Sequence, residues 1–261
     1  MRIAIGIEYD GSGFNGWQSQ DHGRTVQDQV ETALGTVANE TIRVHCAGRT
    51  DTGVHAIHQV AHFDTDATRE PHSWVFGTNS LLENDVNLLW AVVVPDEFHA
   101  RFSAHGRKYR YVILNRPSRS SVMSDKVAWE CRELDVNRMS KAAPALLGEH
   151  DFSAFRAVAC QAKNPVREVR QLEIRQSGDY IIIDIEANAF LQHMVRNIAG
   201  VLMEIGMGKQ PCEWAAEVLQ QRDRTLGGVT APSSGLYLVG IEYPGNFPIP
   251  GPDQRQWPLC L

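Results

Sequence analysis

The stretch CAGRTDTGVHA, residues 46–56, contains a single carboxylate, Asp51, two positions after Arg49. Its other residues are small or favour turns, and strand-like patterns precede and follow it. Gly48 and Gly53 flank the acid, which predicts a rigid loop between two strands. Taken alone, such an aspartate would accept backbone N–H groups in an Asx-turn. The fold class follows from the elements on either side of this loop.

Alternating or short apolar runs predict strands at 3–9, 42–47, 58–64, 87–95, 108–114, 167–176, 180–189 and 235–243. Apolar residues at helical spacing predict a helix from Val26 with Thr25 as its N-cap, and further helices at 136–147, at 191–205 and after Pro211. The order of elements in residues 1–106 is similar to that in residues 107–261. We therefore expect an α+β protein of two similar halves with these boundaries, each an antiparallel sheet backed by helices. The proline-rich tail, 244–258, is predicted to be an extended surface segment.

Composition indicates a globular protein. The chain has 261 residues, of which 43% are hydrophobic, and no stretch approaches the roughly 20 apolar residues of a membrane span. Its start, MRIAIGIEYDG, lacks the features of a signal peptide, so we expect a cytoplasmic protein with no membrane partner. The odd number of cysteines and the lack of a C-x-x-C pair suggest reduced thiols: Cys46, Cys131, Cys160, Cys212 and Cys260.

The charge is unevenly distributed. A net charge of −6 would by itself argue against a nucleic-acid partner. However, residues 98–124 contain no acid, and a second acid-free run covers 152–167. The first run is either a solvated surface or a face that binds RNA phosphates. Its cations are Arg101, Arg107, Lys108, Arg110, Arg116 and Arg119.

Two motifs suggest other chemistry. Gly11, Gly13 and Gly16 have the spacing of a dinucleotide-binding fingerprint, but no helix begins directly after them. A tight loop that brings backbone close to a ligand is the better interpretation, which argues against a nicotinamide or flavin enzyme. The segment HAIHQVAH suggests a metal site, yet on a strand His58 and His62 share a face that His55 does not. These histidines are predicted to be structural or on the surface.

The string GRTDTGVHA resembles the catalytic signature of the TruA-type tRNA pseudouridine synthases, G-R-T-D-x-G-V-H-A. Thr52 stands where that family commonly has alanine. Further strings similar to family motifs follow in the same order and extend the resemblance over nearly the whole chain. They are EYDGSGFNGWQ (8–18), FHARFSAHGRKYRYVI (98–113), GEHDFSAFR (148–156), NAFLQHMVRNIAG (188–200) and GLYLVGIEYP (235–244).

The resemblance implies roles for individual residues. It makes Asp51 the nucleophile, Arg49 the side chain that extracts and holds the target uridine, and Tyr109 the aromatic on which the base stacks. It makes Arg196 the partner of the Asp51 carboxylate and Leu236 an apolar wall of the pocket. The basic run around Tyr109 would then contact the RNA backbone through Arg101, Arg107, Lys108 and Arg110.

The resemblance also implies an activity, namely isomerisation of uridines 38, 39 and 40 in the anticodon stem-loop of tRNA after base flipping. It implies the pseudouridine synthase fold with a central RNA-binding cleft, a homodimer, and no cofactor or metal. Two rival interpretations are a catalytically silent RNA-binding module, which would not require Asp51, and a metal-dependent hydrolase. The hydrolase would use the histidines together with Asp64 or Asp66.

Overall fold

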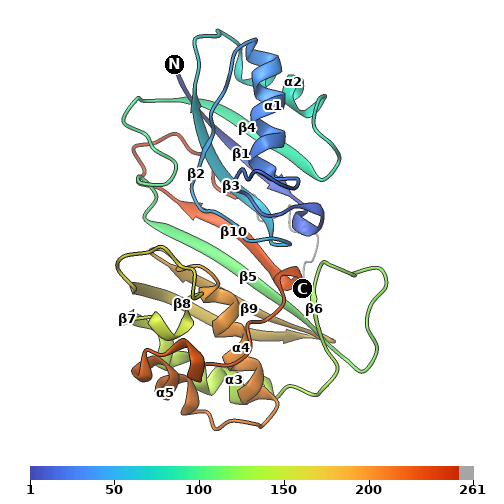
Figure 1. Cartoon of the computed structure of the whole chain (residues 1–261), viewed down its shortest axis with the longest axis vertical. Helices are drawn as coiled ribbons and strands as arrows, with labels where there is room; N and C mark the ends of the chain where they lie inside the picture. Colours follow the sequence, from blue (N-terminus) through green and yellow to red (C-terminus); the bar gives the residue numbers. More distant parts are fainter. Residues whose placement is uncertain (253–261) are drawn as a thin grey trace. The chain divides into compact units, whose positions relative to one another are not determined.

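The computed structural model describes residues 1–252 and is a mixed α+β protein, as predicted (Figure 1). It consists of two compact units. Within the described residues, the first comprises Met1–Arg107 and residues 237–252, and the second comprises Lys108–Leu236. The last strand is thus grouped with the first unit, whereas the sequence halves placed it in the second. Within the described residues, no helix is long and apolar enough to cross a membrane.

The first unit contains strands in the order β4-β1-β3-β10. The middle strand β1 runs antiparallel to both β3 and β4, and β10 joins β3 in parallel where Tyr237 lies opposite His55. A short strand, β2, pairs with the other end of β3. The strands are β1 (Arg2–Tyr9), β2 (His45–Cys46), β3 (His55–Asp64), β4 (Val86–Val94) and β10 (Leu236–Glu242). Only two residues of the strand predicted at 42–47 are therefore paired.

Two helices accompany this sheet and contact each other, α1 (Val26–Ala38) and α2 (Pro71–Asn79) (Figure 1). Helix α1 starts where predicted, because the Thr25 side chain accepts a hydrogen bond from the Asp28 backbone N–H. Helix α2 was not predicted. It buries only Trp74 and Thr78, so its apolar periodicity is weak, and Pro71 at its first turn was the available signal.

The second unit has strands in the order β5-β9-β8-β7, with β6 parallel to β5. Strands β8 and β9, predicted at 167–176 and 180–189, pair as a hairpin, and Gly178 has a positive φ of 56° in its turn. Short β6 and β7 were not predicted. The strands are β5 (Gly106–Asn115), β6 (Ala128–Glu130), β7 (Gly148–Asp151), β8 (Val166–Ser177) and β9 (Tyr180–Ala187).

Three helices of this unit contact one another, α3 (Val136–Ala142), α4 (Met194–Gly206) and α5 (Trp214–Gln221). The helix predicted over 136–147 is α-helical only as far as Ala142, and a 3-10 turn with Pro144 near its start continues it. Helix α4 is buried along most of its length, so it forms the centre of this helical layer. Further 3-10 turns are Gly11–Gly13, Ser153–Phe155, Arg224–Leu226 and Ser233–Gly235. Part of the predicted proline-rich tail, together with Cys260, lies outside the described residues.

Candidate active site

The loop that carries Asp51 joins β2 to β3 and is held by its own backbone and by two aromatic residues. The Thr50 and Tyr9 hydroxyl groups share a buried hydrogen bond of 2.8 Å. The Trp17 backbone N–H donates to the Thr50 carbonyl at 3.1 Å, and the Val54 N–H donates to the Asp51 carbonyl at 3.1 Å. The half-buried Asp51 therefore lies between two fixed backbone positions.

The glycine-rich segment before α1 lies directly against this loop. Gly16 has φ +90°, and a Cβ atom added there would lie 2.6 Å from the Thr50 carbonyl oxygen. One added at Gly11 would lie 2.0 Å from the Val54 oxygen. A 3-10 turn begins at the first glycine and the next α-helix begins only at Val26, which differs from the strand–turn–helix arrangement of a dinucleotide-binding fingerprint. Because these glycines have no Cβ atom, the backbone of their segment can lie directly against the Asp51 loop of the same chain.

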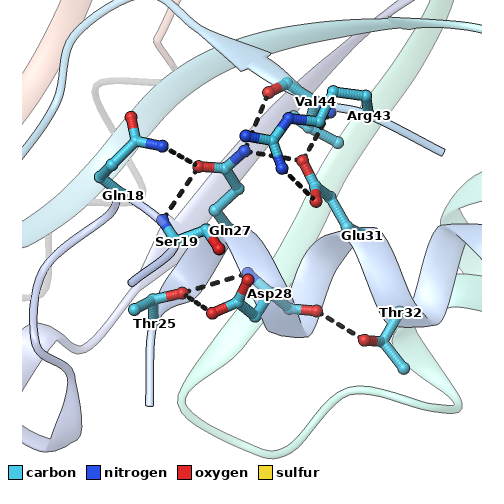
Figure 2. Close-up of polar contacts among 9 residues, drawn as sticks. All are labelled: Gln18, Ser19, Thr25, Gln27, Asp28, Glu31, Thr32, Arg43 and Val44. Atoms are coloured by element: carbon cyan, nitrogen blue, oxygen red, sulfur yellow. Dashed lines mark hydrogen bonds and ion pairs between the residues drawn. The ribbon is translucent and has the colours of Figure 1, made fainter. Parts of the chain in front are cut away.

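A buried amide anchors the same segment to α1 (Figure 2). The Gln27 Oε1 atom accepts hydrogen bonds from Gln18 Nε2 at 2.9 Å and from the Ser19 N–H at 3.1 Å. Glu31 Oε1 accepts from Gln27 Nε2 at 2.7 Å and from the Val44 N–H at 2.8 Å. One helix face thus holds both the glycine-rich segment and the chain that leads into the Asp51 loop.

Two unneutralised arginines lie near the start of this loop. Arg49 and Arg101 are exposed, and within residues 1–252 neither guanidinium makes an ion pair. Burial raises the pKa of the Cys46 thiol to about 12, and the nearby charges of Arg49 and Arg101 oppose that rise. Phe102, 76% exposed, lies beside Arg101, whose guanidinium carbon is 5.7 Å from its ring centroid. This surface offers two cations and an aromatic face to a ligand.

Arg107 differs from these two arginines, because its side chain is buried. Its guanidinium donates to the backbone oxygens of Ala104 at 3.0 Å, Arg101 at 2.7 Å and Ala47 at 3.2 Å. It therefore braces the turn after Arg101 against the start of the Asp51 loop. This placement gives Arg107 a structural role, and its expected contact with RNA phosphates stays a prediction.

The histidines of β3 are buried, and two of them accept hydrogen bonds from backbone N–H groups. His55 Nδ1 accepts from the Gly11 N–H at 3.0 Å, and His62 Nδ1 accepts from the Ala100 N–H at 3.2 Å. Burial, with the charges of neighbouring groups including His99, lowers the pKa of His62 to about 4. Neutral His62 can accept that hydrogen bond, so it helps to hold the turn that begins at Ala100. No group of acids, histidines and cysteines in residues 1–252 is arranged to hold a metal ion.

In the second unit, the cations around Tyr109 have acidic neighbours. Arg110 binds both carboxylate oxygens of Asp184, at 2.6 and 3.0 Å, and Lys108 lies 3.2 Å from Glu186. Tyr109 is 8% exposed, and its ring contacts Phe190 edge to face with centroids 5.1 Å apart. Tyr109 is thus more deeply placed than a surface aromatic, and its two cationic neighbours are neutralised.

Arg196 lies on the first turn of α4 and is half-buried. Its Nε donates to the Ala231 carbonyl at 2.8 Å, and the Ala231 N–H donates to the Arg196 carbonyl at 3.2 Å. Burial raises the pKa of the Tyr111 hydroxyl, and the nearby charge of Arg196 opposes that rise. The two hydrogen bonds with Ala231 therefore hold the guanidinium plane of Arg196.

Leu236, 6% exposed, follows the last 3-10 turn and begins β10.

The predicted site residues fall into two groups. Asp51 and Arg49 share one loop of the first unit, and Tyr109, Arg196 and Leu236 belong to the second. Sequence reasoning missed the Tyr9–Thr50 bond, the support by Arg107 and the segment that holds Arg196. A tyrosine or a threonine gives no local signal of a distant partner.

Comparison with known proteins identifies the family. A family model described as tRNA pseudouridine synthase matches residues 5–103 and 142–244. The chain belongs to the tRNA pseudouridine synthase family. The protein is therefore an isomerase that converts uridine to pseudouridine in tRNA, and the resemblance seen in the motifs is confirmed.

Several curated relatives, each named tRNA pseudouridine synthase A, match the enzyme over nearly its whole length. The protein of Nitrosococcus oceani is 60% identical over 250 residues, covering 96% of each chain. That of Methylococcus capsulatus is 56% identical and covers 95% of this chain and 91% of its own. That of Alcanivorax borkumensis is 54% identical and covers 100% and 97%. A chain of the solved "Crystal Structure of a Cbf5-Nop10-Gar1 Complex" aligns with 90% of the enzyme and 48% of itself, at 12% identity and a TM-score of 0.37.

Proposed function

We propose that the enzyme isomerises uridines 38, 39 and 40 in the anticodon stem-loop of tRNA, with Asp51 as a covalent nucleophile. The observation that carries this proposal is the immobilised loop. Asp51 is the acid of the family-like string GRTDTGVHA, and its loop is fixed by Tyr9 and Trp17 through Thr50. A nucleophile held in one geometry attacks with much less entropic cost than a mobile one.

The reaction needs an ionised carboxylate and no redox partner. The glycosidic C–N bond breaks, the base rotates, and a C–C bond forms to the same sugar; the ring carbon that forms this bond loses its proton and the released ring nitrogen gains one, so the composition of the uridine is unchanged. Burial alone would raise the pKa of a carboxyl group and weaken it as a nucleophile, whereas a guanidinium partner favours the charged form. We assign that partner role to Arg196, whose Nε bond to Ala231 fixes the plane in which its terminal nitrogens would meet the carboxylate.

A stacked uridine cannot reach the carboxylate, so the base must be flipped out at a cost of a few kcal/mol. Stacking on an aromatic ring returns about 1–3 kcal/mol, and we assign this role to Tyr109. Leu236 supplies an apolar wall for the base. We assign to the exposed Arg49 the role of holding the extruded nucleotide, because it belongs to the same loop as Asp51 and its guanidinium makes no ion pair within residues 1–252.

The RNA backbone is contacted mainly by the surface formed by Arg49, Arg101 and Phe102. Their exposure and the lack of acids between Phe98 and Ser124 support this assignment. Lys108 and Arg110 contribute less, since each already lies against a carboxylate. The resemblance supports a cytoplasmic homodimer with one tRNA lying across both subunits.

The test compares Asp51→Asn with the wild-type enzyme on an unmodified tRNA. Pseudouridine is mapped by carbodiimide-dependent reverse-transcription stops, and tRNA affinity is measured separately. The matched control is Asp66→Asn, which changes an exposed acid of the same unit. We expect stops at positions 38, 39 and 40, no product with Asp51→Asn, unchanged tRNA binding, and full activity of the control.

Appreciable turnover by Asp51→Asn would refute the nucleophile assignment, and stops elsewhere in the tRNA would refute the substrate positions. A parallel reaction in excess EDTA is expected to proceed at the normal rate, because the proposed chemistry draws only on protein side chains. Loss of activity on chelation, with recovery on adding a divalent metal, would favour the hydrolase-like metal interpretation.

A further inference from the structure

The segment between α5 and the last 3-10 turn, residues 224–231, is folded around a single arginine. Arg224 Nη1 donates to the Gly228 carbonyl at 3.0 Å and more weakly to that of Gly227 at 3.4 Å. Its Nη2 donates to Thr230 Oγ1 at 2.8 Å and to Asn197 Oδ1 at 3.0 Å. Both terminal nitrogens are therefore engaged inside the protein, and neither is directed toward an external phosphate.

A second contact ties this segment to α4. The Thr230 hydroxyl donates to Asn197 Oδ1 at 2.6 Å, so this oxygen accepts from both Thr230 and Arg224. Asn197 is 2% exposed, and its Nδ2 donates to the Phe155 carbonyl at 2.6 Å. The amide is thus buried and bonded at both ends, which makes it a rigid attachment point on the helix.

The far end of the segment holds Arg196, the residue that precedes Asn197. Arg196 and Ala231 exchange two hydrogen bonds, one through the Arg196 Nε and one through its carbonyl. Between the two attachments the segment lies directly on the helix, because a Cβ atom added at Gly200 would be 1.9 Å from the Val229 oxygen. The direction of the Arg196 guanidinium therefore depends on where residues 227–231 lie.

We propose that Arg224 is a positioning residue for the isomerisation. It closes residues 224–231 on α4, so that the Ala231 carbonyl holds Nε of Arg196 and sets the orientation of that guanidinium. This inference rests on the proposed role of Arg196 as partner of the nucleophile. Displacing a reacting or activating group by about 1 Å can lower the rate by about 100-fold. The hydrogen bonds of Arg224 would prevent a displacement of this size at Arg196.

The experiment measures the single-turnover rate, the Kd for tRNA and the melting temperature of Arg224→Ala, Arg224→Lys and Thr230→Val. We expect Arg224→Ala to lower the rate by about 10- to 100-fold while the Kd changes by less than about threefold. Lysine keeps the charge but loses the fork of donors, so it restores the rate only in part. Thr230→Val replaces the hydroxyl group by a methyl group of nearly equal size. It should lower the rate less than Arg224→Ala, and it keeps the test decisive if Arg224→Ala unfolds. Arg222→Ala, an exposed arginine two positions away, is the matched control and keeps the wild-type rate.

A double-mutant cycle with Arg196→Ala separates the outcomes. If Arg224 acts through Arg196, adding Arg224→Ala to Arg196→Ala slows the reaction no further. Independent, multiplicative losses would overturn the inference, as would a raised Kd with an unchanged rate, which indicates an RNA contact. A lowered rate for Arg196→Ala together with a normal rate for Arg224→Ala would reject this inference but not the proposed role of Arg196. A normal rate for Arg196→Ala rejects the proposed role of Arg196 and this inference with it.

Discussion

Replacing Gly16 by alanine tests whether the position of the Asp51 loop controls the chemistry. Gly16 has φ +90°, and its added Cβ would lie 2.6 Å from the Thr50 oxygen and 3.1 Å from the Asp51 carbonyl carbon. Both of these are backbone atoms, so no flexible side chain can move aside to make room. The variant must therefore shift the loop, the glycine-rich segment or both.

The size of the shift follows from the contact distance. Moving the Cβ and the Thr50 oxygen from 2.6 Å to ordinary contact at 3.4 Å separates them by 0.8 Å. Part of this motion is expected to fall on the loop, and a misplacement of about 1 Å lowers a rate by about 100-fold. The positive φ adds a stability cost of about 1–2 kcal/mol, which at about 2–4 °C per kcal/mol lowers Tm by several degrees.

The assay is the single-turnover rate of pseudouridine formation, measured beside tRNA affinity and Tm. Gly208→Ala is the matched control, since Gly208 has φ +72° and its added Cβ meets nothing within 4 Å. Both variants should lose similar stability from the backbone strain, but only Gly16→Ala should lose about 10- to 100-fold in rate. A Gly16→Ala enzyme as active as the control would refute the argument that the fixed loop positions the nucleophile.

Two further predictions concern stability and RNA binding. Because folding lowers the pKa of His62 from 6.5 to about 4, the unfolded chain binds more protons between these values, and stability should fall as pH drops through this window. Urea midpoints at pH 7.5 and pH 5 check this, and His62→Gln should flatten the dependence; an unchanged slope would contradict it. Phe102→Ala should raise the Kd for tRNA, since stacking on an aromatic contributes about 1–3 kcal/mol per base, whereas Phe76→Ala, similarly exposed at 71% on α2, should not. Equal effects of the two variants would show that Phe102 makes no specific contact with RNA.

Local patterns in the sequence were sufficient for most elements. Alternation and helical spacing report which side chains are buried, so they located β1, β4, β9 and α1. They failed where burial is slight or hydrogen bonding ends the element early. Helix α2 buries two residues, and the predicted strand at 42–47 is paired only at His45 and Cys46.

The sequence alone thus determined the fold class, the family and the string that carries Asp51, because motifs and periodicities are local and need no knowledge of neighbours in space. The tertiary structure decided which residues hold that string. The glycines that suggested a nucleotide site instead admit the Asp51 loop, and Arg107, expected at the RNA surface, is buried against backbone carbonyls. It also decided that β10 pairs with β3 and that Arg224 clamps the segment that holds Arg196. These contacts join residues far apart in the chain, and their hydrogen bonds depend on geometry that no local pattern of residue types records.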